Sequence, residues 1–226
     1  AHGAIYKNKK VGSFGDISTW SFCQDKIMST GGEGGMISTN DKKLWLKCWS
    51  LKDHGKNYIN VFHKKQRTIF KWLHDDLGSN YRMTEMQAVI GREQLKTLDK
   101  QVKKRNLIAN LYLNGLKDYY LKYDILNKPD FLNQNNQIKK DKYTHAFYRL
   151  NLFINKNKIN QNELIQKLNK YKINCGVGSC PEIYKEKIFK KLNYYPKKRL
   201  LNAKLLGETS IMFPINPYKN ITKIKS

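Results

Sequence analysis

The fold is decided by the stretch Ser21-Phe-Cys-Gln-Asp-Lys26-Ile-Met-Ser-Thr-Gly-Gly-Glu-Gly-Gly35. Apolar and polar residues alternate before it, over residues 17–22, and again after it, over residues 36–39. This alternation predicts two short strands. Glycines allow positive φ and close approach of the backbone, so the four glycines around Glu33 predict a tight turn between the strands.

Two chemical roles are open for Lys26 beside this turn. A lysine held in a desolvated, orienting pocket can act as a Schiff-base nucleophile. It can equally be one more solvated side chain in a protein with 43 Lys and Arg residues. The chemistry of the residue alone favours the solvated lysine.

Further blocks occur in a fixed order along almost the whole chain. They are Gly12-Ser-Phe-Gly-Asp16, Thr39-Asn-Asp41, Asp53-His-Gly55, Gly78-Ser-Asn-Tyr-Arg-Met-Thr-Glu-Met-Gln-Ala88, Gln94-Leu95, Leu98-Asp99, Gly178-Ser-Cys-Pro-Glu-Ile-Tyr184 and Leu206-Gly-Glu-Thr-Ser210. Together with residues 21–35 they resemble the DegT/DnrJ/EryC1/StrS sugar aminotransferases, which use pyridoxal 5'-phosphate. Several ordered blocks are more specific than one short motif. The resemblance implies the type I aminotransferase fold, of the α/β class.

The resemblance also implies roles for three residues. Lys26 would bind the cofactor's aldehyde and then move protons at the substrate carbon. Its retention favours transamination, because relatives that act as dehydratases replace it, typically with histidine. Ser21 would donate its hydroxyl to the cofactor phosphate, although a strand-end serine can also be satisfied by the backbone. Asn80 would reach the partner subunit's cofactor phosphate, or serve as a turn residue before a helix.

Three further residues are weaker candidates for substrate binding. Arg82 suits bidentate contact with a phosphate or carboxylate. His54 lies in a matched block, but a lone loop histidine is more often simply exposed. Tyr184 either contributes to a substrate pocket or packs as an ordinary aromatic residue. Glu33, between glycines, is interpreted as a carboxylate that secures the turn by accepting bonds from backbone N–H groups.

The net charge of +25 suggests a nucleic-acid or other anionic partner. However, the lysines are spread along the chain, and no finger or RNA-recognition motif accompanies them. We interpret the charge as a solvated surface with some attraction for anionic nucleotide sugars, and expect no nucleic-acid partner. A basic nucleic-acid-binding module stays an alternative, as does a catalytically silent relative.

Cysteine spacing and hydropathy bear on the compartment. The four cysteines form no Cys-x-x-Cys pair and no zinc spacing, so no metal is predicted. Free thiols in a reducing cytoplasm are the simpler interpretation. No apolar run approaches the length of a membrane span, so we expect no membrane insertion.

The chain begins Ala1-His-Gly-Ala, where the family has an upstream Asp-x-x-Gln or Asp-x-x-His element that holds the cofactor ring. The resemblance therefore implies a fragment that lacks the N-terminal part. Residues 1–100 would be the C-terminal half of the large cofactor-binding domain with the start of the interdomain helix, and residues 101–226 the small C-terminal α/β domain. A homodimer is implied, with a nucleotide-linked keto-sugar as substrate and glutamate as amino donor.

Local patterns predict further elements. Asn40-Asp41 should cap a helix over residues 44–51, and Thr84 with Gln87 forms a capping box before a long helix. Residues 56–78 and 127–142 are expected to be loops, and residues 146–154 and 173–177 strands. Asn160 should cap a helix with one apolar face. The predicted buried helix positions are Met86, Val89, Ile90, Leu98 and Val102, then Leu164, Ile165, Leu168 and Tyr171.

Overall fold

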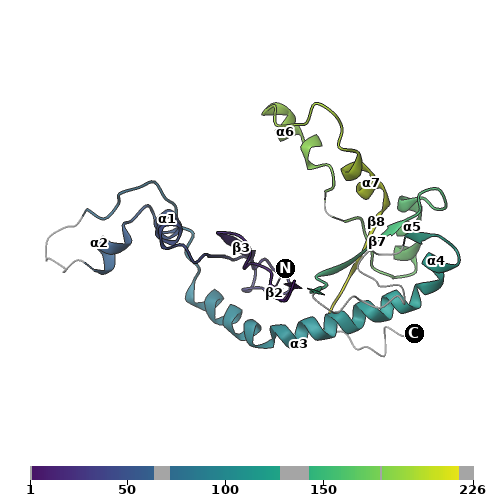
Figure 1. Cartoon of the computed structure of the whole chain (residues 1–226), viewed down its shortest axis with the longest axis horizontal. Coiled ribbons are helices and arrows are strands. Elements are labelled where there is room, and N and C mark those ends of the chain that lie inside the picture. The colour runs from purple at the N-terminus through teal and green to yellow at the C-terminus, as the bar shows by residue number, and fades with distance from the viewer. Residues whose placement is uncertain (1, 64–71, 128–142, 179, 219–226) are drawn as a thin grey trace. The chain divides into compact units, whose positions relative to one another are not determined.

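The computed structural model describes residues 2–63, 72–127, 143–178 and 180–218. The chain divides into two compact units, residues 1–101 and 102–226. Helix α3, Glu85–Gly115, runs unbroken from the first unit into the second (Figure 1). Each unit is described by itself below.

Two antiparallel strand pairs lie in the first unit. Strands β1, Ile5–Tyr6, and β2, Lys9–Lys10, form a short hairpin. Strands β3, Ser18–Ser21, and β4, Gly35–Ser38, pair with Ser21 opposite Gly35. The two strands predicted on either side of the glycine turn are therefore confirmed.

Helix α1, Lys42–Lys52, begins at the predicted cap, because the Asp41 carboxylate accepts bonds from the N–H groups of Lys43 and Leu44 at 2.7 and 3.0 Å. The prediction of a loop over residues 56–78 is wrong for α2, Tyr58–Phe62. Capping by Asn57 and packing of the Tyr58 ring on Trp45 and Trp49 stabilise this turn of helix without a periodic pattern. Residues 64–71 lie outside the described chain.

Helix α3 begins with the predicted capping box. Thr84 Oγ1 accepts a bond from the Gln87 N–H at 3.3 Å, and the Thr84 N–H donates to Gln87 Oε1 at 3.0 Å. The predicted buried face is correct for Leu98 and Val102 and wrong for the first turns, where Met86 is 77% exposed. Val89 and Ile90 are exposed too.

The second unit contains a three-stranded antiparallel sheet in the order β5-β7-β8. Leu150 of β7 lies opposite Phe213 of β8, and Leu152 lies opposite Ile211. After α3, the elements of the second unit are α4 Lys117–Leu121, β5 Leu126–Asn127, β6 Tyr143–Thr144, β7 Arg149–Ile154, α5 Gln161–Lys170, the 3-10 turn η1 Ile183–Lys185, α6 Lys187–Lys191, α7 Leu201–Thr209 and β8 Ser210–Pro214.

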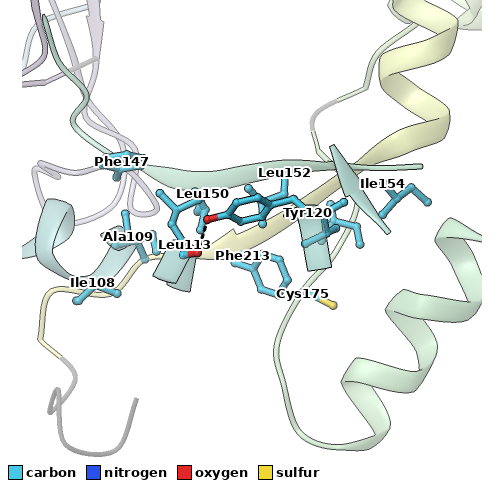
Figure 2. Packing of buried hydrophobic residues seen from close by; sticks show 13 residues of the cluster. Ile108, Ala109, Leu113, Tyr120, Phe147, Leu150, Leu152, Ile154, Cys175 and Phe213 are labelled. Atoms are coloured by element: carbon cyan, nitrogen blue, oxygen red, sulfur yellow. Dashed lines mark hydrogen bonds between the residues drawn. The ribbon is translucent and has the colours of Figure 1, made fainter. Parts of the chain in front are cut away.

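The core of this unit packs alternate residues of β7 against the C-terminal half of α3 (Figure 2). Leu150, Leu152 and Ile154 are each no more than 1% exposed. The Tyr120 hydroxyl donates to the Leu113 carbonyl at 2.8 Å, which satisfies the polar end of a buried ring. The predicted apolar face of α5 packs on this core through Leu164, Ile165 and Leu168, whereas Tyr171 is exposed.

Two predicted strands of this unit need correction. The strand expected over residues 146–154 begins only at Arg149. Residues 173–177 form a single bridge, between Gly176 and Met212, and no strand. The Ile173 N–H instead donates to the Leu168 carbonyl, so the segment still continues the end of α5. Of the polar stretch 127–142, Asn127 belongs to β5, and the remainder lies outside the described residues.

A buried arginine joins the start of β7 to the end of β8. Arg105 Nη1 donates to the carbonyls of Phe147, Tyr148 and Ile215 at 3.2, 3.4 and 2.6 Å. These carbonyls lie just before β7 and just after β8. Burial lowers the pKa of Arg105, although an arginine stays charged in proteins. The guanidinium therefore supplies hydrogen bonds to these carbonyls where the pairing of β7 with β8 ends.

Candidate functional site

Lys26 lies in a short loop, residues 22–30, that leaves β3 and returns to the glycine turn; we call it the Lys26 loop. The Phe22 N–H donates to the Gly34 carbonyl at 2.7 Å, and the Thr30 N–H donates back to the Phe22 carbonyl at 3.2 Å. The Lys26 N–H donates to the Cys23 carbonyl at 3.0 Å, which closes a turn. Both ends of the loop are thus fixed at the same residue.

The side chains of Lys26 and Ser21 are accessible to solvent. Lys26 Nζ lies 3.0 Å from Asp25 Oδ1, and the lysine side chain is 32% exposed. Ser21 is exposed, and its Oγ accepts a long bond from the Cys23 N–H at 3.5 Å. That bond uses a lone pair and not the hydroxyl hydrogen, so the hydroxyl retains the capacity to donate.

The glycine turn is secured through the main chain of Glu33. Its carbonyl accepts bonds from Thr30 Oγ1 at 3.0 Å and from Gln87 Nε2 at 2.9 Å. Its carboxylate accepts a bond from the Cys23 thiol at 3.3 Å. The expectation that the carboxylate binds backbone N–H groups is replaced by this arrangement.

His2 is a site residue that the sequence analysis missed. Its ring is only 6% exposed and stacks on Trp20 and Phe22, with centroids 5.9 and 5.5 Å apart. Its pKa is lowered mainly by burial and least by the positive charge of Lys26, while a hydrogen bond to the main chain of Ser21 opposes this change. The contacts with Trp20, Phe22 and the Met28 N–H place His2 beside the Lys26 loop. A lone histidine near the start of a chain carries no sequence signal of such a place.

A second group of predicted residues is brought together by a close crossing of two segments. Asp53 forms a bridge with Asn80, and the His54 N–H donates to the Ser79 carbonyl at 3.1 Å. Gly55 has a φ of +79°, and a Cβ there would overlap the Asp76 carbonyl oxygen. Only glycine allows this approach, and it places the Asp-His-Gly motif beside the Gly-Ser-Asn motif.

Polar side chains concentrate at this crossing. Asn80 Oδ1 accepts bonds from the Arg82 N–H and Nε–H at 3.4 and 3.1 Å, and both residues are exposed. Burial would raise the pKa of Asp53, but the hydrogen bond and charge of Lys56, with the charges of Arg82 and Lys52, hold that pKa below its ordinary value. Three cations, Lys52, Lys56 and Arg82, therefore act on the Asp53 carboxylate beside Asn80.

A cavity of about 700 Å³ lies in the first unit. Strands β3 and β4, helix α1 and residues 81–83 line it, and most of the lining is apolar. Arg82 lines this cavity, whereas the other predicted site residues are not part of the described lining. Arg82 is thus the predicted candidate that combines a cation with a hollow large enough for a small ligand.

Tyr184 lies in the second unit and has two structural bonds. Its hydroxyl donates to Glu182 Oε1 at 2.6 Å and accepts from the Leu200 N–H at 3.1 Å. Arg199 binds both oxygens of Glu182, at 2.8 and 2.7 Å. The hydrogen bonds from Arg199 and Tyr184 lower the pKa of Glu182 to about 2. Both bonds of the Tyr184 hydroxyl hold a loop, which favours the packing alternative.

The described residues also bear on metal binding, disulfides and membrane spans. No group of three or more His, Cys, Asp or Glu side chains in that part of the chain is arranged to hold a metal ion. All four cysteines are free thiols. None of the helices within the described ranges has both the length and the apolar character needed to cross a bilayer.

The DegT/DnrJ/EryC1/StrS aminotransferase family matches residues 1–224. The chain belongs to this family. A solved aminotransferase from Psychrobacter cryohalolentis superposes with a TM-score of 0.92 at 42% identity, over 100% of this chain and 57% of that one. The expected family and the type I aminotransferase fold of the α/β class are thereby confirmed.

Two family relatives show how much of a family member this chain spans. GDP-perosamine synthase from Escherichia coli O157:H7 is 43% identical over 116 residues, 51% of this chain and 29% of the relative. The uncharacterized protein MJ1066 of Methanocaldococcus jannaschii is 32% identical over 220 residues, 96% of this chain and 53% of the relative. Even the longer match covers only about half of the relative.

Proposed function

We propose that this chain carries the lysine loop of a pyridoxal-phosphate-dependent aminotransferase that transfers an amino group from glutamate to a nucleotide-linked keto-sugar. The proposal rests on Lys26, an accessible amine in the loop after β3, in a chain that belongs to a family of aminotransferases. The product would be an amino sugar for lipopolysaccharide or another surface polysaccharide. A relative named GDP-perosamine synthase supports this substrate class.

The residues present fit the cofactor. Pyridoxal phosphate offers an aldehyde and a phosphate, and the Lys26 loop and the end of β3 offer the Lys26 amine and the exposed Ser21 hydroxyl. Lys26 would hold the aldehyde carbon covalently and, once displaced by the amino donor, move a proton at the substrate carbon. When bound, the cofactor supplies an electron sink for that proton transfer.

The crossing of residues 53–55 and 78–82 would supply the anion contacts in this proposal. Asn80 would bind the cofactor phosphate of a second subunit, which makes the functional unit a homodimer. Arg82 would bind an anionic group of the nucleotide sugar. His54 and Tyr184 stay weaker substrate-binding candidates, since the main chain of His54 and the hydroxyl of Tyr184 already support loops.

The domain assignment belongs to the same proposal. Residues 1–100 would be the C-terminal half of the large cofactor-binding domain, with the start of the interdomain helix. Residues 101–226 would be the small C-terminal domain. The free thiols of all four cysteines suit a reducing cytoplasm, where such an enzyme would act.

Borohydride trapping tests the proposal. The complete gene product is incubated with pyridoxal phosphate, reduced, digested and mapped by mass spectrometry. A reduced adduct on the Lys26 peptide is expected, and Lys26→Arg should abolish it. Lys43→Arg, at an exposed position of helix α1, is the matched control and should leave the adduct in place. A folded protein without label on Lys26 would contradict the proposal.

A panel of nucleotide-linked keto-sugars with glutamate then tests the substrate class. A catalytically silent relative would show an intact fold without cofactor capture. A basic nucleic-acid module would bind arbitrary DNA with an affinity that falls steeply with added salt. Family membership favours neither alternative.

A further inference from the structure

We infer that His2 is a positioning residue for the Lys26 loop: its ring joins strand β3, which carries Ser21, to the segment that follows Lys26. The inference rests on the proposed function for its catalytic meaning. The contacts that support it stand in the structure whether or not that function is correct.

The first half of the contact is aromatic. Trp20 and Phe22 lie on either side of Ser21 in sequence, and their side chains share one face of the strand. The His2 ring stacks on both, with interplanar angles of 21° and 29°. The opposite face carries Ser21, which is exposed. His2 therefore fixes the strand from behind the hydroxyl that would meet the cofactor phosphate.

The second half is a hydrogen bond on the far side of the lysine. His2 Nδ1 accepts a bond from the Met28 N–H at 3.3 Å, two residues after Lys26. A phenylalanine at position 2 would reproduce the stacking but could not accept this bond. The Met28 amide is buried, so losing its acceptor would carry the cost of an unsatisfied donor. His2 therefore makes both contacts at once: its flat ring stacks on the two aromatic residues, and its Nδ1 accepts the Met28 hydrogen bond.

The contact requires a neutral ring with its proton on Nε2. Nδ1 can accept a bond only when it carries no proton, and protonation would convert it into a donor that faces the Met28 N–H. Burial and the nearby charge of Lys26 lower the pKa of His2, which favours the neutral form. His2 therefore does not act as the proton carrier, and its contribution is geometric.

The test compares three variants of the complete gene product. His2→Phe keeps a flat ring and removes the acceptor. His2→Asn removes the ring and keeps an acceptor oxygen close to the position of Nδ1. His74→Asn changes an exposed histidine of the same unit and serves as the matched control. Folding of each variant is checked by circular dichroism before it is compared.

Two readouts separate positioning from a general loss of stability. Hydrogen exchange of the Met28 amide, in the absence of cofactor, should become about tenfold faster in His2→Phe, as expected for the loss of one hydrogen bond. The pyridoxal phosphate concentration that gives half-maximal borohydride labelling of Lys26 should rise by a similar factor. The saturating yield should stay unchanged, because the amine itself is intact. His2→Asn should recover part of both effects.

The outcomes also separate this inference from the proposed function. If Lys26 of the unaltered protein is not labelled, the proposed function fails, and Met28 exchange alone decides the role of His2. If Lys26 is labelled and His2→Phe requires no more cofactor than the unaltered protein, the inference is overturned and the function stands. Unchanged Met28 exchange in His2→Phe overturns it as well. If His2→Phe does not fold, the inference is tested with His2→Asn alone. A Met28 amide that exchanges in His2→Asn as fast as an unprotected amide then overturns the inference.

Discussion

The two units of the chain differ in how their apolar residues are used. Of the buried apolar residues that the structure describes, four lie in the first unit: Phe22, Ile27, Met28 and Leu98. The second unit has one contiguous cluster built from α3, α4, the three-stranded sheet and Cys175 (Figure 2). The first unit instead leaves Met36 and Ile37 of β4 each 49% exposed. Apolar side chains also line its two large cavities, of about 700 and 660 Å³.

Because of this difference, the larger core and the candidate site lie in different units. The second unit buries its sheet with residues of its own. The first unit is held by caps, a glycine turn and side-chain bonds to the backbone, and it carries the candidate site. Segments with few buried apolar contacts open most readily in the native state. Phe22, Ile27 and Met28 of the Lys26 loop are three of the four buried apolar residues of the first unit, so the rest of that unit depends on individual polar and aromatic contacts more than the core of the second unit does.

The largest expected effect comes from the core of the second unit. Leu152→Ala should lower the free energy of unfolding by about 3 kcal/mol, because it leaves a cavity among fully buried neighbours. The matched change Ile37→Ala, on half-exposed β4, should cost less than about 1 kcal/mol. Urea unfolding measures both. All four tryptophans lie in the first unit, so their fluorescence reports that unit separately from circular dichroism. Equal costs would contradict the comparison.

Arg105 offers a polar counterpart within the second unit. Arg105→Met should destabilise it by about 2 kcal/mol, because three carbonyls lose their donor. Arg105→Lys is the control: it keeps the charge but lacks the guanidinium fork, so it should recover only part of the loss. Chemical denaturation followed by circular dichroism measures both variants. Full recovery by lysine would show that charge, and not geometry, matters here.

Helix caps should give smaller and equal effects in both units. Asp41 caps α1 and Asn160 caps α5, each accepting bonds from two backbone N–H groups. Asp41→Ala and Asn160→Ala should each cost about 1 kcal/mol, since a cap acts on its own helix regardless of the core beneath it. Urea midpoints of the two variants check this. A much larger cost for Asp41 would show that the first unit depends on its caps for global stability.

The smallest expected effect is a dependence of stability on pH. Burial lowers the pKa of His2 in the first unit. The unfolded histidine binds a proton near pH 6.5, whereas the folded one binds it only at lower pH. The stability contributed by this group is therefore complete above pH 6.5 and is lost as the pH falls through the lower pKa of the folded state. The free energy of unfolding, measured between pH 7.5 and 5, should show this slope, and His2→Phe should reduce it.

Local signals made much of the fold predictable. The caps at Asp41 and Asn160, the capping box at Thr84 and the strands on either side of the glycine turn depend on residues a few positions apart. The missed features depend on distant partners. Helix α2 is stabilised by the rings of α1, and the apolar side chains Met86, Val89 and Ile90 in the first turns of α3 are exposed.

The residues of the candidate site also fall into those that local sequence indicates and those that depend on distant contacts. Lys26, Ser21 and Asn80 were found through the resemblance, because the family motifs are contiguous in sequence. The burial of His2 depends on Trp20, Phe22 and Met28, and no local pattern marks it. Tyr184 could be placed in its motif, but its bonds to Glu182 and Leu200 became visible only in the folded chain.

One glutamine couples the start of a helix to the closure of a turn 54 residues earlier. Gln87 completes the capping box with Thr84, and its amide group also donates to the Glu33 carbonyl. Nucleating a helix is unfavourable until its first turn is fixed. A contact that fixes this turn and closes the glycine loop at once makes the two events cooperative during folding. The Lys26 loop and the helix that runs into the second unit are thus expected to form in a single step.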